Sequence, residues 1–106
     1  MRFYIVNKTK SIDAVGEYNE ETKEMTVLKG SVLSETVVST GSFRGTRAIL
    51  KAREGVMKGN VLAEDISFKS PSTAANFVRG SSSNGLICWK DENGKTLKEV
   101  ISEVHE

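Results

Sequence analysis

Chemically reactive side chains are scarce in this chain of 106 residues, which has one cysteine, Cys88, and one histidine, His105. A single cysteine cannot form an internal disulfide framework or a cysteine-based metal cluster. His105 stands next to the C-terminal end, where chains fray, so we expect it to face solvent rather than to activate a nucleophile. The sequence also contains no glycine-rich loop of the nucleotide-binding types. We therefore expect a protein that is not an enzyme and that uses no metal or cofactor.

Net charge and long apolar runs are lacking as well. The chain has 15 basic and 14 acidic residues, so its overall charge neither favours nor excludes nucleic acid as a partner. No apolar run approaches the roughly 20 residues that a membrane-spanning helix needs. The segment 1–8 becomes polar too soon for a secretory signal. We expect a cytoplasmic protein of bacterial type with no membrane partner.

The length of the chain indicates one small domain that spans residues 1–106. The expected strands or extended segments are 2–8, 11–18, 24–29, 32–38 and 61–68. A polar turn at 19–22 predicts that 12–29 forms a hairpin. Helical spacing of apolar residues predicts a helix at 43–54. Because short turns join most of the strands, the predicted fold class is α+β, with a small antiparallel β-sheet packed with two or three helices.

The stretch from 67 to 97 organises the rest of the chain. Ser70 is a good N-cap, Pro71 suits the first position of a helix, and Gly80 supplies the left-handed residue that ends one. These signals predict a helix over 71–79. The polar run at 81–85 predicts a loop after it.

Four consecutive apolar residues, 86–89, follow this loop. Apolar side chains on both alternating faces indicate a strand that is covered on both sides. We expect Trp89 to lie in the core and Cys88 to be a buried, unreactive thiol. Beyond this strand, 91–94 predicts a tight turn and Thr96 predicts the cap of a last helix.

Charge is unevenly distributed along the chain. Residues 11–35 contain six acidic and two basic residues, whereas residues 43–58 contain five basic residues and one acidic residue. The apolar face of the helix at 43–54 is expected to hold Phe43, Thr46, Ile49 and Leu50. Its basic residues, Arg44, Arg47, Lys51 and Arg53, are expected to lie mostly elsewhere. A basic helix on a nearly neutral protein can face an anion, or it can be an ordinary solvated surface.

The start of helix 71–79 is a second candidate for anion binding. Its amides and the hydroxyls of Ser70, Ser72 and Thr73 suit a phosphate or a carboxylate, and Lys69 precedes them. The loop after the helix can add hydroxyl and amide donors if it returns to the same surface. The alternative is that Ser70 only caps the helix while Ser72 and Thr73 face water.

Several segments have the order and spacing of a known family. They are Thr26-Val27-Leu28-Lys29-Gly30-Ser31, Ser70-Pro71-Ser72-Thr73-Ala74-Ala75, Gly80, Asn84-Gly85, Trp89-Lys90-Asp91 and Gly94-Lys95-Thr96-Leu97. Over about residues 25–100, the chain resembles an uncharacterised bacterial domain family with an SPSAAA segment, an NGW segment and a W-K-D-x-x-G-K-T-L ending. The resemblance implies a domain that occurs C-terminal to GIY-YIG endonuclease domains or within restriction-type proteins. The central stretch is also similar to the RAMA domain of restriction and methylase systems, which implies recognition of DNA.

The chain departs from this family in two ways. Leu86 stands where the family has an aromatic residue after Asn-Gly. If that ring stacks on a ligand, the contact is lost here; if it belongs to the core, nothing follows. The chain also has no GIY-YIG segment, so the cleavage activity of multidomain relatives cannot be carried over. The resemblance implies an accessory domain whose partner is a nuclease or a methylase.

Two interpretations of the function remain open. The first is a recognition domain that binds DNA, with lysine and arginine neutralising phosphates and polar groups adding hydrogen bonds. Its expected contact residues are Arg44, Arg47, Lys51, Lys69, Ser70, Ser72, Arg79, Asn84 and Lys90. The second is a protein-interaction or structural domain, monomeric or homodimeric, that offers a strand edge and binds no nucleic acid.

Overall fold

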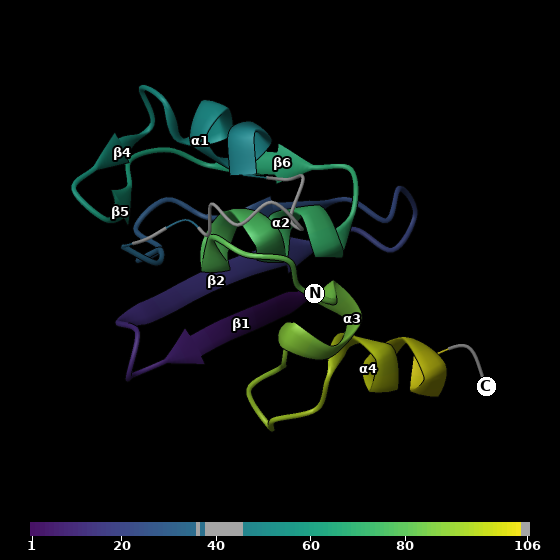
Figure 1. Cartoon of the computed structure of the whole chain (residues 1–106). Helices are drawn as coiled ribbons and strands as arrows, with labels where there is room; N and C mark the ends of the chain where they lie inside the picture. Colours follow the sequence, from purple (N-terminus) through teal and green to yellow (C-terminus); the bar gives the residue numbers. More distant parts are fainter. Residues whose placement is uncertain (36, 38–45, 105–106) are drawn as a thin grey trace.

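The main element of the fold is a four-stranded antiparallel sheet (Figure 1). The computed structural model describes residues 1–35, 37 and 46–104. The strands are β1 (Arg2–Asn7), β2 (Ile12–Tyr18), β3 (Met25–Val27) and β6 (Ile66–Phe68), in the spatial order β1-β2-β3-β6. β1 and β2 pair along their length, and β2 pairs with β3. The predicted antiparallel sheet and the predicted hairpin over 12–29 are therefore confirmed.

Four helices and a two-stranded hairpin complete the described part of the chain. The helices are α1 (Thr46–Arg53), α2 (Pro71–Arg79), α3 (Gly85–Cys88) and α4 (Leu97–Val104), and the hairpin joins β4 (Met57–Lys58) to β5 (Val61–Leu62). Helix α2 packs on β2, β3 and β6, and Figure 1 shows α1 on one side of α2 and α3 with α4 on the other. The fold class is α+β, as predicted, although the extended region expected at 61–68 divides into β5 and β6.

The core lies between the sheet and α2. The residues of β2 on the covered face are Ile12, Ala14, Gly16 and Tyr18. Trp89 packs directly under Gly16, because a Cβ at that glycine would lie 2.9 Å from the indole ring. Trp89 is fully buried, as predicted, and its Nε1 donates a hydrogen bond to the carbonyl oxygen of Pro71 at 3.0 Å. This bond links the core to the start of α2.

Helix α2 has the bounds that the sequence predicts. Ser70 has an extended backbone, and its Oγ accepts a hydrogen bond from the amide of Thr73 at 3.2 Å. Gly80 adopts the left-handed conformation with φ of 69°, and its amide donates to the carbonyl of Asn76 at 2.8 Å. Both ends are therefore fixed by residues at the helix termini themselves.

The predicted strand at 86–89 is wrong, because this segment contributes most of the short helix α3. Asn84 caps the helix, since its side-chain oxygen accepts a hydrogen bond from the amide of Leu86 at 3.1 Å. Leu86 and Ile87, expected to be covered, are 39% and 53% exposed. The intrinsic preference of apolar residues for strands is weak and depends on context. In this segment, the stabilisation of the helix start by the Asn84 side chain outweighs that preference.

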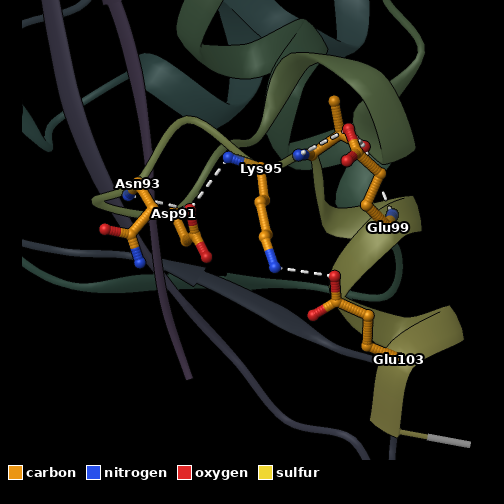
Figure 2. A network of polar contacts seen from close by, with 6 residues as sticks. Asp91, Asn93, Lys95, Glu99 and Glu103 are labelled. Carbon is orange, nitrogen blue, oxygen red and sulfur yellow. Dashed lines mark hydrogen bonds and ion pairs between the residues drawn. The ribbon is translucent and has the colours of Figure 1, made fainter.

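The turn at 91–94 and the last helix follow the prediction (Figure 2). One carboxylate oxygen of Asp91 accepts hydrogen bonds from the amides of Asn93 and Lys95, both at 2.9 Å. Thr96 caps α4, since its Oγ1 accepts from the amide of Glu99 at 3.2 Å. The polar side chains of this turn therefore hold the backbone in place.

Helix α1 differs from the prediction in its side-chain orientations. Ile49 is buried, but Leu50, expected on the same face, is 53% exposed. Adjacent helical residues point about 100° apart, so a narrow contact with α2 can bury only one of them. Arg53, expected on the solvated side, is half-buried. Phe43, the other large apolar residue expected on this face, lies outside the described residues.

Candidate functional site

Arg53 fixes the end of α1 to the core. Its Nη2 donates to the carbonyl oxygen of Phe77 at 2.6 Å, and its Nη1 donates to that of Ser34 at 2.9 Å. The guanidinium carbon also lies 5.7 Å from the centre of the Phe77 ring. Burial lowers the pKa of Arg53, and these acceptors compensate the charge that burial removes from water. Helix α1 is therefore held in one orientation against α2.

The outward face of α1 carries two of the predicted contact residues, Arg47 and Lys51. Residues four apart lie on one stripe of a helix, and both side chains are exposed. Within the described residues neither side chain has an ion pair, and the helix itself contains no acidic residue. We call Arg47 and Lys51 the basic stripe. Arg44, the third predicted residue of this helix, lies outside the described residues.

A small hollow of about 170 Å³ lies beside the basic stripe, between α1 and α2. Its lining residues are Ala48, Ile49, Ala52, Phe68, Thr73, Asn76 and Phe77. Ala48 and Ala52 each follow a residue of the stripe in the sequence, but neither Arg47 nor Lys51 lines the hollow itself. The rings of Phe68 and Phe77, with centroids 4.9 Å apart, make one wall apolar. No charged residue lines this hollow.

The start of α2, the other predicted anion site, is engaged by contacts within the fold. The Oγ of Ser70 caps the helix, and the Oγ of Ser72 accepts a hydrogen bond from the amide of Gly85 at 3.0 Å. A Cβ on Gly85 would lie 2.4 Å from the amide nitrogen of Ser72, so the backbone of α3 covers that amide. Asn84 is occupied by capping α3. We call Ser70, Ser72, Asn84 and Gly85 the serine junction, because they join α2 to α3.

Lys69 lies next to the serine junction, on a hollow of about 560 Å³ at the end of the sheet. The lining residues are Tyr18, Glu20, Lys23, Lys69, Ser70, Pro71, Ser72, Leu86 and Ile101. Leu86, at the position where the resembled family has an aromatic residue, therefore faces a hollow and not the core. We call this site the tyrosine hollow. Sequence reasoning missed it because four segments that are distant in the sequence form it.

Arg79 and Lys90 border a different hollow, of about 480 Å³, along the outer edge of β1. We call it the edge hollow; its lining residues are Tyr4, Ile5, Val6, Asn7, Arg79, Ile87, Cys88, Lys90, Asp91, Glu92 and Gly94. The Nη1 of Arg79 lies 3.3 Å from the sulfur of Cys88 and 3.2 Å from the Oγ of Ser83. Cys88, expected to be buried, is only half-buried and borders this hollow.

The structure therefore distributes the predicted residues over three places rather than one face. The basic stripe lies on α1, Lys69 lies with the serine junction, and Arg79 and Lys90 lie on the edge hollow. Figure 1 shows why, since α2 separates α1 from α3 and α4. Helix α1 is thus kept apart in space from α3 and α4.

The remaining charged groups of the described chain include an exposed ion pair between Lys95 and Glu103. Lys95 donates to Glu103 at 2.7 Å (Figure 2), and this contact raises the pKa of Lys95. Among residues 1–35, 37 and 46–104, no group of three or more metal-ligating side chains comes together. In the same residues, every helix is too short or too polar to cross a membrane.

Comparison with known proteins identifies a family but no activity. The model of a domain of unknown function, DUF4357, matches residues 3–101. No curated protein and no solved structure matches the chain. The matched region extends beyond the expected 25–100 and includes β2 and all of β1 except Arg2.

Proposed function

This chain belongs to the DUF4357 family of domains of unknown function, and from that premise we propose that it is a non-catalytic recognition domain that binds nucleic acid through the basic stripe. The observation that carries the proposal is a pair of exposed cations on a helix whose orientation Arg53 fixes. The cations are available to phosphates because, within the described residues, no carboxylate is paired with them.

The spacing of the two cations suits a charged backbone. Four helical residues rise about 6 Å, so Arg47 and Lys51 can each meet a different phosphate. Like charges at this spacing repel each other by about 0.2–0.5 kcal/mol, and a bound polyanion relieves that repulsion. Because Arg53 already holds α1, little ordering of the helix is needed on binding.

The expected interaction is weak and independent of sequence. Phosphate contacts position a protein on nucleic acid but carry no base information. A site with so few cations belongs to the range of non-specific binding, with Kd on the order of 10⁻⁴ to 10⁻⁶ M. Such affinity suits an accessory domain whose catalytic partner, a nuclease or a methylase, supplies the chemistry in the bacterial cytoplasm, as the family resemblance implies.

Fluorescence anisotropy with a labelled DNA duplex tests the proposal. Two neutralised phosphates give a slope of log K against log salt of about −2. The double variant Arg47→Glu/Lys51→Glu should lose binding at every salt concentration. The matched control is Lys8→Glu/Lys10→Glu, which makes the same charge change in the exposed turn after β1, away from α1 in Figure 1. An affinity that does not depend on salt concentration, or that falls equally in both double variants, would show that the basic stripe is not the binding surface.

A protein-interaction role is the second candidate, and the edge hollow favours it. Val6 and Ile87 border this hollow and are 57% and 53% exposed. The backbone groups of Tyr4 point away from β2 and bond to Lys90 at 2.7 and 3.0 Å. Those of Val6, two residues later, point the same way and have no partner within the described chain. An antiparallel second copy can add to β1 at this position.

Sedimentation velocity over a concentration series distinguishes this second candidate. A homodimer through β1 should dissociate in Val6→Lys and persist in Val61→Lys, which changes an exposed valine of β5 instead. A wild-type protein that sediments as a monomer throughout would exclude the homodimer.

A further inference from the structure

Tyr18 carries a hydroxyl that no group of the described residues bonds to. The side chain is only 7% exposed, and no hydrogen bond to its hydroxyl is made within the described residues. No fully buried polar side-chain atom of the described chain lacks a hydrogen-bond partner, so the hydroxyl must be reachable from outside the fold. It is therefore open to water or to a ligand. The tyrosine hollow borders the ring and supplies that access.

Strand alternation decides which hollow the ring faces. Tyr18 lies on the covered face of β2, where it meets Phe3 edge-to-face with ring centroids 6.3 Å apart. It also borders an acidic hollow that contains Glu17 and Thr26. Those two residues are cross-strand partners on the opposite face of the sheet. The Tyr18 ring therefore belongs to the tyrosine hollow.

The charges around the tyrosine hollow favour an anion. Lys23 and Lys69 stand on its rim against one carboxylate, Glu20. Within the described chain neither lysine has an ion pair. Burial and the nearby Glu20 raise the pKa of Tyr18. A tyrosine phenol is protonated at neutral pH even without such a shift, so it can donate a hydrogen bond there. A donor and two cations thus converge on one space.

The rest of the wall is apolar and firmly placed. Leu86, Pro71 and Ile101 contribute it, and the serine junction fixes α3 against α2. The hydroxyls of Ser70 and Ser72 are already engaged in that junction, which leaves few polar groups for a ligand. A volume of about 560 Å³ lies within the usual range of small-molecule sites.

We propose that the tyrosine hollow binds a small carboxylate with an apolar body, at a site separate from the nucleic-acid surface on α1. The carboxylate accepts a hydrogen bond from Tyr18 and lies near Lys23 and Lys69, while the apolar body rests on Leu86. A single carboxylate matches one phenolic donor and two lysines, whereas a neutral analogue lacks the group that they recognise.

The experiment uses 3-phenylpropionate as the probe and its neutral amide as the matched control. Amide chemical shifts of the ¹⁵N-labelled full chain are followed to about 10 mM ligand, which detects a Kd in the millimolar range. We expect saturable shifts at Tyr18, Lys23, Lys69 and Leu86. Tyr18→Phe removes only the hydroxyl and should weaken binding at least tenfold, as expected for a hydrogen bond to a charged group. Tyr4→Phe, which removes a phenol on β1, should leave binding unchanged.

Several results would overturn the site. They are an absence of saturable shifts, an equal response to the amide, or unchanged affinity in Tyr18→Phe. Shifts centred on α1 would place the ligand elsewhere and have the same consequence. The amide spectrum of Tyr18→Phe should match that of the wild type away from the hollow, which shows that the variant is folded. The outcome is independent of DNA binding, because Arg47→Glu/Lys51→Glu should bind 3-phenylpropionate normally.

Discussion

The serine junction and the basic stripe contain side chains of the kinds that bind phosphate, yet the fold uses them in opposite ways. The hydroxyls of Ser70 and Ser72 accept hydrogen bonds from backbone amides of α2 and α3. Arg47 and Lys51 have no ion pair within the described residues and face water. The difference shows that suitability for an anion depends on which groups the fold has already satisfied. Mutations in the junction should change stability, and mutations in the stripe should change binding.

The largest expected effect is that of Trp89→Ala. The indole fills the core under Gly16 and also bonds to Pro71, so its loss should lower the free energy of unfolding by about 3–5 kcal/mol. Urea unfolding followed by circular dichroism measures this. Leu86→Ala, a truncation of an exposed neighbour, is the control and should have a much smaller effect. Equal stability of Trp89→Ala and wild type would show that the junction is not tied to the core.

Gly85→Ala tests the close approach of α3 to α2. The added Cβ would lie 2.2 Å from the carbonyl carbon of Pro71, and backbone atoms cannot move aside as a flexible side chain can. We expect a loss of about 1–3 kcal/mol in urea unfolding. Shift changes in the amide spectrum should concentrate on the serine junction. A variant as stable as the wild type would contradict the observed packing.

Ser70→Ala removes the cap of α2 and should cost about 1 kcal/mol of unfolding free energy. Its affinity for DNA should remain that of the wild type, because the hydroxyl points into the helix start. Ser82→Ala, in the exposed loop after α2, is the control for stability. A variant with normal stability but weakened DNA binding would show that Ser70 contacts the DNA and does not only cap the helix.

The smallest effect on stability is expected for Arg47→Gln/Lys51→Gln. Removing two like charges at helical spacing should raise the free energy of unfolding by about 0.2–0.5 kcal/mol. The same urea experiment measures it. A loss above about 1 kcal/mol would mean that these cations have partners in the fold, since surface substitutions normally stay within about 0.5 kcal/mol.

Local signals were sufficient for the elements whose ends are encoded beside them. Ser70, Pro71 and Gly80 gave the bounds of α2, the pattern of β-forming residues gave β1 and β2, and the polar turn at 19–22 gave the hairpin of β2 with β3. The segment 86–89 was misassigned because its apolar residues fit a strand equally well. The cap by Asn84 and the close packing of Gly85 against Pro71 favour a helix. That packing is a tertiary contact, which the local sequence does not reveal.

The candidate site was predictable in composition but not in arrangement. Arg47 and Lys51 were identified from charge and helical spacing alone. That Arg79 and Lys90 lie on another hollow depends on the packing of α2 between α1 on one side and α3 with α4 on the other. The contacts of Arg53 and the position of Tyr18 on a hollow depend on residues far away in the sequence, which a local pattern does not record.

Parallel DNA titrations of three proteins test the central claim most directly. Anisotropy of a labelled duplex at low salt compares wild type, Arg47→Gln/Lys51→Gln and Ser70→Ala/Ser72→Ala. The account predicts that the stripe variant loses about two units of salt slope together with most of its affinity, while the junction variant, where still folded, binds as the wild type does. Loss of binding in the junction variant with full binding in the stripe variant would contradict the account.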